Sequence, residues 1–316
     1  MSGPIILLGP QRPTPNLTAI VADLPGDGPV LTITAGWRYD ESDREALDEA
    51  IGADAEPLPL YAWFDEIVGE SPALARAYKE RQREVRKLKE LYRLRLKHAM
   101  DTVHALQARR EEDPELVEPE LEAALEMVRA IDESFLIRSS AIQMGSRQQL
   151  RALEPPRVAR RRTEAARRIL EARAVLVAGG HVGVLRNRLM FFELDFALRQ
   201  ASQRGTAVLG WSAGAMVLTD RVLLFYDDPP EGHSYPELLD RGLGLVSGLV
   251  ALPHARRRLN LEDRDRVSAL AGRFESSACV GMENGAHLVH SGGFWENRGP
   301  ADTALLMSVD GSVDPL

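Results

Sequence analysis

A serine stands between two glycines in Gly210-Trp211-Ser212-Ala213-Gly214. The apolar run 207–210 before it has the pattern of a strand, and residues 213–218 after it have the pattern of a helix. A serine on a sharp strand-to-helix turn has its hydroxyl raised above the sheet edge, where it can act as a nucleophile in acyl transfer. The spacing therefore predicts a nucleophile at Ser212, and the simpler alternative is a glycine-rich turn that only packs.

A serine nucleophile needs a base, and a histidine oriented by a carboxylate is the common solution. Among the seven histidines, His254 follows an expected strand end, at the edge where α/β sheets carry their functional loops. His98 and His104 lie in a strongly charged helical region. His287 and His290 belong to an expected strand, where a spacing of three sends them to opposite faces and excludes a shared metal site. We therefore expect His254 to be the base.

Two adjacent acids lie between the nucleophile and this histidine, directly after the apolar run 222–226. Successive residues of an extended chain face opposite ways, so only one of Asp227 and Asp228 is expected to reach the imidazole. Asp227 is favoured as the third member of a triad. The alternatives are Asp228 in that role, or plain acids in a turn.

Acyl transfer also requires N–H donors for the oxyanion that forms during attack. One donor is the amide of Ala213, next to the nucleophile. Gly180 and His181 follow the expected strand 174–178, and their amides are candidates for the second donor. The alternative is a phosphate-binding loop, but Gly179-Gly180-His181-Val182-Gly183 has neither the G-x-G-x-x-G spacing nor the lysine of a P-loop.

The elements that must position these residues alternate between strand and helix, which is typical of a parallel α/β sheet. Strands are expected at 4–8, 29–36, 174–178, 207–210, 246–252 and 279–290, and helices at 43–51 and 184–203. The pattern divides the chain into an α/β domain, 1–68 and 169–316, and an inserted helical hairpin, 69–168. A basic helix at 157–168 is expected to return the chain to the sheet.

The predicted hairpin consists of a long helix over 73–106 and a second helix that begins after the interruption at 113–119. Residues 79–110 hold eleven Lys and Arg against four acids, and residues 111–133 hold ten acids against one Arg. Antiparallel packing would bring the two charge signs together. The alternative is that the basic helix binds a nucleic acid or another acidic partner.

Composition excludes several classes of protein. The 316 residues carry a net charge of −8, which gives no overall reason to bind nucleic acid or an anionic membrane. The single cysteine, Cys279, cannot form an internal disulfide, and the expected setting is the cytoplasm. Residues 1–9 have four consecutive apolar residues and no basic region, so neither an export signal nor a membrane segment is expected.

These motifs together resemble peptidase family S51, the aspartyl dipeptidases and cyanophycinases of the class I glutamine amidotransferase-like superfamily. The resemblance rests on the strand and glycine pair 174–180, on Gly210–Ala215, and on Gly242–Val250 leading to Pro253-His254; residues 264–266 and 280–285 also fit. It covers about 1–65 and 172–290. It implies a flavodoxin-like fold, and the family's nucleophile, acid and histidine match Ser212, Asp227 and His254 in order and approximate spacing. The chain departs from the family pattern at His181-Val182 and at Ala255, and the hairpin is additional.

The expected function is hydrolysis of a peptide or isopeptide-like amide, possible substrates being small aspartyl peptides, with no cofactor and no metal. Substrates of the resembled family carry an aspartyl carboxylate, for which Arg256 or Arg258 would be a suitable partner. One alternative is a non-catalytic scaffold that uses the hairpin for assembly. Another is an amidotransferase-like enzyme, which Cys279 does not favour because it lies in an expected buried strand rather than at the elbow. The apolar stripe of the hairpin must pack on the α/β body or on another copy of the chain, and a homodimer is the expected assembly.

Overall fold

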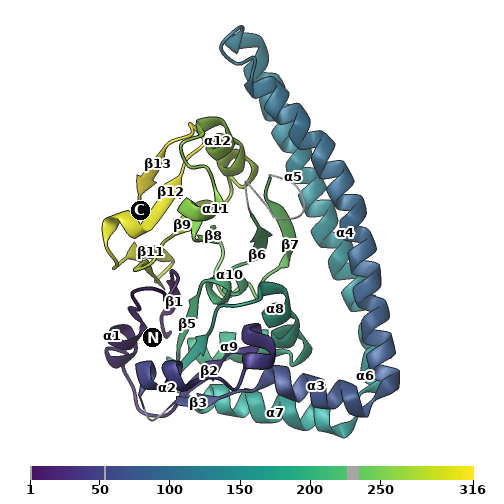
Figure 1. Cartoon of the computed structure of the whole chain (residues 1–316). Coiled ribbons are helices and arrows are strands. Elements are labelled where there is room, and N and C mark those ends of the chain that lie inside the picture. The colour runs from purple at the N-terminus through teal and green to yellow at the C-terminus, as the bar shows by residue number, and fades with distance from the viewer. Residues whose placement is uncertain (1, 53–54, 226–234) are drawn as a thin grey trace.

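The structure is a computed structural model that describes residues 2–52, 55–225 and 235–316 (Figure 1). A seven-stranded sheet has the order β11-β10-β1-β5-β4-β2-β3, in which β1 to β5 run parallel to one another and β10 pairs antiparallel with both β1 and β11. Its strands are β1 (Ile5–Leu8), β2 (Val30–Ile33), β3 (Ala55–Pro57), β4 (Ala174–Val177), β5 (Ala207–Trp211), β10 (His287–Ser291) and β11 (Phe294–Asn297). This confirms the predicted α/β class with a mostly parallel central sheet.

The two faces of this sheet are buried under different helices. Alternate residues such as Leu7, Leu31 and Val175 pack in one cluster with α3, α7, α8 and α9. The residues between them, such as Leu8 and Leu176, pack in a second cluster with α1 and α2. The alternation has the period of two that a pleated strand imposes. The strands read as continuous apolar runs because both faces are covered.

Helices surround and extend this sheet. They are α1 (Leu17–Ala22), α2 (Glu45–Ile51), α3 (Leu60–Glu70), α4 (Pro72–Gln107), α5 (Pro114–Gly145), α6 (Arg147–Leu153), α7 (Pro156–Glu171), α8 (Val182–Phe191), α9 (Leu194–Gln203), α10 (Ala213–Leu218), α11 (Ala255–Arg258) and α12 (Arg264–Arg273), with 3₁₀ turns at Ala35–Asp40 and Ala301–Thr303. The single helix expected over 184–203 is two helices, α8 and α9, because Glu193 between them has left-handed backbone angles. Within the described ranges, no helix has the length and apolar character needed to cross a membrane.

Two smaller sheets complete the fold. The first has the order β13-β12-β9-β8, with β8 (Leu249–Pro253) and β9 (Ala278–Met282) parallel, and with β12 (Ala304–Met307) and β13 (Val313–Pro315) antiparallel beside them. The second is the antiparallel pair β6 (Arg221–Leu224) and β7 (Glu237–Arg241). Cys279 is buried in β9, as expected. We call the three sheets, with every helix except α4 and α5, the α/β body.

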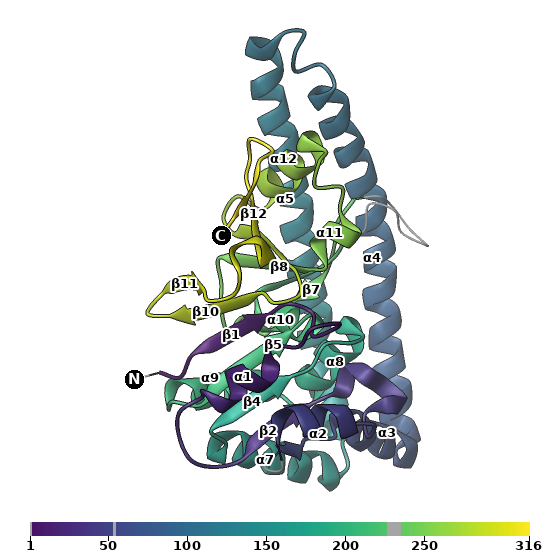
Figure 2. The ribbon, with the colours of Figure 1, turned by 60° about the vertical axis from the view of Figure 1, so that its left-hand side comes forward.

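Helices α4 and α5 form the long antiparallel hairpin that projects beyond the α/β body in Figures 1 and 2. The predicted apolar stripe is its packing seam, because Leu88 and Val103 of α4 and Val128 of α5 are at most 5% exposed. Among the described residues, the basic side chains of α4 do not form a row of ion pairs with the acidic side chains of α5, although the sequence places opposite charges on the two helices. In the described ranges, the pair that joins the two arms is Arg110–Glu118 at the tip. Apolar side chains occupy the seam between the two helices, so cations of α4 such as Arg93 lie outside it.

Polar side chains of α4 and α5 hold β7 against the hairpin. Arg93 of α4 pairs with Glu237 at 2.8 Å, and the Tyr92 hydroxyl accepts the Leu238 N–H at 3.2 Å. On α5, Gln143 donates to Asp240 at 2.7 Å. The hairpin therefore binds β7 along its length.

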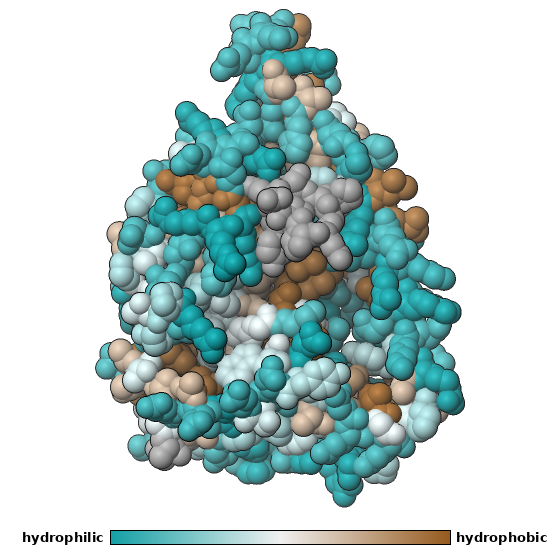
Figure 3. Space-filling view, in the orientation of Figure 1, coloured by the Kyte–Doolittle hydropathy of each residue, from teal (hydrophilic) through white to brown (hydrophobic). Residues whose placement is uncertain are grey.

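In the space-filling view hydrophilic residues dominate this side of the molecule, and apolar residues show in a central hollow (Figure 3).

Candidate active site

Ser212 connects the end of β5 to the start of α10 with backbone angles φ 49° and ψ −119°. Non-glycine residues rarely adopt this conformation, and such strain is concentrated at functional positions. The Ser212 N–H donates to the Leu8 carbonyl of β1 at 3.2 Å. A Cβ on Gly214 would lie 2.0 Å from the Val177 carbonyl oxygen, so only glycine lets α10 pack this closely on the end of β4. The sequence therefore forms a tight elbow with a half-buried serine.

The glycine pair after β4 lies beside this serine. A Cβ on Gly179 would come within 2.9 Å of the Ser212 Cβ, so the loop backbone directly flanks the hydroxyl-bearing side chain. Among the described residues, the N–H groups of Gly180 and Ala213 donate to no acceptor. Two backbone donors are thus available on the flank of Ser212.

The amide of His181, also predicted as an oxyanion donor, is occupied. Its N–H donates to the Gly36 carbonyl at 2.8 Å, because the turn after β2 packs against this loop. The His181 side chain is exposed and its Nδ1 accepts the Val184 N–H at 3.3 Å, which caps α8. His181 therefore serves as a local anchor in this structure.

His254 follows β8 with left-handed backbone angles, φ 59° and ψ 39°. Its N–H donates to the Met282 carbonyl of β9 at 2.9 Å, and its side chain is half-buried. Burial lowers the pKa of His254, and the positive charges of Arg258 and Arg257 lower it further. A lowered pKa favours the neutral imidazole, which is the form that can accept a proton.

Ser212 and His254 follow the carboxyl ends of strands in two different sheets. The strand β1 links them, because Leu8 is in register with Trp211 and the Gly9 N–H donates to the Ala286 carbonyl beyond β9 at 3.1 Å. Within the described part of the chain no hydrogen bond joins the serine hydroxyl to the imidazole. Functional loops of parallel α/β sheets gather at this edge.

The predicted acids Asp227 and Asp228 lie outside the described residues. A further carboxylate at this edge, Glu283, was not among the acids predicted from the sequence. It follows β9, and its Oε1 accepts the N–H of Arg256, two residues after His254, at 2.8 Å. The sequence predicts one strand over 279–290 that includes Glu283, but the structure has two strands there, β9 and β10, in different sheets. The turn pair Asn284-Gly285 is the sequence signal that would have placed Glu283 at a strand end.

The two arginines predicted to bind a substrate carboxylate lie in different surroundings. Arg256 is exposed, and its guanidinium donates to the Asp302 carbonyl at 3.3 Å. The Arg258 guanidinium lies over the Phe225 ring at 5.3 Å. Of these two residues, Arg258 is the one whose charge acts on His254.

Comparison with known proteins finds one family model that matches part of this chain. Residues 148–296 match the model of peptidase family S51. The fold resembles the crystal structure of a peptidase from an acI-B1 Actinobacterium, with 15% sequence identity, a TM-score of 0.52, and coverage of 100% of this chain and 98% of that one. A candidate peptidase E protein from Listeria monocytogenes EGD-e is 11% identical, with a TM-score of 0.45 over 95% of this chain and all of that one. A search of curated proteins finds no match. The segment that carries Ser212 and His254 therefore matches peptidase family S51, the family that the sequence motifs resemble.

Proposed function

We propose that this protein is a serine-type peptidase that hydrolyses a small peptide or isopeptide-like amide with Ser212 as the nucleophile. The observation that carries the proposal is the strained elbow at Ser212, flanked by the glycine loop after β4, where the Gly180 and Ala213 N–H groups donate to no acceptor among the described residues. If this position only packed, glycine would adopt its backbone angles with less strain than serine does. The match to a peptidase family supports the same reaction class.

In the proposed mechanism His254 accepts the Ser212 proton while the serine oxygen attacks the amide carbon. The resulting oxyanion receives hydrogen bonds from the Gly180 and Ala213 amides. His254 then gives the proton to the leaving amine, and the same histidine activates water to release the acid product and regenerate the serine. A carboxylate that holds the correct imidazole tautomer completes the triad. We assign that role to Asp227, with Asp228 as the alternative.

For the substrate we propose an amide that carries a carboxylate near the cleaved bond, as an aspartyl group would. A guanidinium is the natural partner for such a group because it binds carboxylates in a bidentate manner. Arg258 is the better supported of the two predicted arginines, because its charge already acts on His254. Arg256 remains the second candidate.

Labelling with a fluorophosphonate tests the nucleophile without knowledge of the substrate. We expect one covalent adduct, located at Ser212 by peptide mass spectrometry and absent from Ser212→Ala. The exposed-loop variant Ser42→Ala is a matched control and should label like the parent. Once a substrate is identified, Ser212→Ala should retain less than about a thousandth of the parent turnover. That small residual rate is what the oxyanion donors and substrate binding supply without a nucleophile. An unlabelled but folded parent would favour the scaffold alternative.

A further inference from the structure

A cavity of about 350 Å³ lies between the hairpin and the α/β body, beside α6, the short helix that follows α5. Its walls come from α4, α5, α6, α7, α8, the start of α9, and β7. The volume is in the range of small-molecule sites, which often lie at junctions between structural units. Ser212 and His254 do not line it, so it is separate from the candidate active site.

The described lining is rich in guanidinium groups. Six arginines and four acids line the cavity: Arg81, Arg147, Arg151, Arg162, Arg186 and Arg241, with Glu154, Glu193, Asp195 and Asp240. Arg241 is paired outside this set, with Glu133 at 2.6 Å. Counting Glu133 with the acids still leaves one positive charge in excess.

Two of the pairs are internally balanced. Arg162 makes a two-pronged contact with Glu154 at 2.6 and 2.7 Å, and buried Arg186 pairs with Asp240 at 3.0 Å. Both pairs lie within the α/β body, because Glu154 follows α6, Arg162 is in α7, Arg186 is in α8 and Asp240 is in β7. They account for the structural part of the charge cluster and need no ligand.

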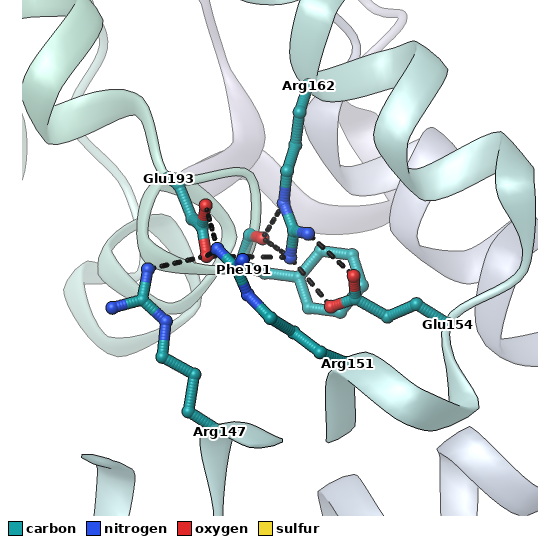
Figure 4. Close-up of polar contacts among 6 residues, drawn as sticks. All are labelled: Arg147, Arg151, Glu154, Arg162, Phe191 and Glu193. Carbon is teal, nitrogen blue, oxygen red and sulfur yellow. Dashed lines mark hydrogen bonds and ion pairs between the residues drawn. The ribbon is translucent and has the colours of Figure 1, made fainter. Parts of the chain in front are cut away.

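The remaining cations are less fully matched. Arg147 and Arg151 share the single carboxylate of Glu193, at 2.8 and 2.7 Å (Figure 4). Glu193 has left-handed backbone angles, φ 55° and ψ 44°. Non-glycine residues in this strained conformation are concentrated at functional sites. One carboxylate therefore serves two guanidinium groups on the cavity wall.

Arg81 has no acidic partner in the described part of the chain. Its guanidinium lies over the Tyr78 ring at 4.6 Å, and its Nε is buried without a hydrogen-bond partner. Burial lowers the pKa of Arg186, and the positive charge of Arg81 acts in the same direction, so the two like charges are close. An anion between these walls would relieve that repulsion and satisfy unused N–H groups.

We propose that this cavity binds a small molecule that carries a phosphate or carboxylate group, with Arg81 and Arg151 as its main cationic contacts. Guanidinium groups recognise both anions through paired N–H donors. Bound there, the anion would join α4 to α6 and so brace the base of the hairpin. This inference does not depend on the proposed peptidase activity.

Isothermal titration with pyrophosphate and with malonate, at constant ionic strength, tests the proposal on the full-length protein. We expect saturable binding of at least one anion, and a loss of affinity of tenfold or more in Arg81→Gln. Arg83→Gln is the matched control, because Arg83 lies on the same helix, is 62% exposed and pairs with Glu80. It should bind within twofold of the parent.

Arg151→Gln provides a second, independent variant, since Arg147 still pairs with Glu193 when Arg151 is replaced. Circular dichroism checks that each variant is folded. Absence of saturable binding of both anions to the parent would overturn the proposal. Parent-like affinity in folded Arg81→Gln and Arg151→Gln would overturn it equally, because binding would then occur elsewhere.

Discussion

Replacing Asp132 by Asn should destabilise the junction between the hairpin and the body far more than a change at the next residue. Asp132 of α5 accepts hydrogen bonds from Arg273 of α12 at 2.6 and 2.7 Å and from the Tyr92 hydroxyl of α4 at 2.8 Å. The side chains of Arg273 and Asp132 are only 1% and 8% exposed. Burial alone would lower the pKa of Arg273, yet Asp132 and Tyr92 raise it above its ordinary value. The arginine is therefore a buried cation that depends on one carboxylate.

The expected cost follows from this burial. Removing one partner of a buried pair leaves an uncompensated charge and typically costs about 3–5 kcal/mol. The neighbouring Glu133 pairs with Arg241 at 2.6 Å, but both side chains are more than 40% exposed. Exposed pairs contribute about 0–1 kcal/mol because water screens them. Asp132→Asn and Glu133→Gln thus remove the same formal charge with very different expected effects.

Thermal unfolding followed by circular dichroism measures the difference. At about 2 °C per kcal/mol for a chain of this size, Asp132→Asn should lower Tm by about 6–10 °C. Glu133→Gln should lower it by about 2 °C or less. Limited proteolysis should show early cleavage in the hairpin of the first variant only. Equal, small shifts in both variants would refute the argument that the buried cluster holds the hairpin to the body.

The other predictions concern the candidate active site. Asp227→Asn should reduce kcat by about 10⁴ if this carboxylate orients the imidazole, and Asp228→Asn and Glu283→Gln should have much smaller effects; a larger loss in Glu283→Gln would give the role to Glu283. Arg258→Gln should move the acid limb of the kcat/KM profile to higher pH, because removal of a nearby positive charge raises the pKa of His254. An acid limb that does not move would contradict the electrostatic effect of Arg258 on His254.

Much of the fold was predictable because its signals are local. Continuous apolar runs that end in glycine predicted strands such as β4 and β5, and the spacing of Leu88 and Val103 predicted a long helix that packs on one side. The same local logic located the elbow, since a serine between glycines at a strand end requires no knowledge of distant residues. The family model matches the segment 148–296, which carries most of the motifs on which the resemblance rests.

The contacts that escaped prediction are made between residues far apart in the chain. The break at Glu193 coincides with ion pairs to Arg147 and Arg151, more than forty positions earlier. The His181 amide is occupied by a carbonyl from the turn after β2. Glu283 stands near His254 because β8 and β9 are parallel neighbours, a pairing that no local pattern encodes. The triad assignment and the homodimer stay predictions.

The way β7 is held has a consequence for engineering the chain. Glu237 and Asp240 are both buried. Deleting the hairpin would remove Arg93 and Lys89 from Glu237, while Asp240 would lose Gln143 and keep its pair with Arg186, so one buried carboxylate would be left without its cations. A minimal, hairpin-free version should therefore misfold or aggregate instead of yielding a smaller working unit. The tip at 108–113, by contrast, is mostly exposed. A reporter peptide or fluorescent label inserted there should be tolerated, since exposed loop tips accept insertions without loss of buried contacts.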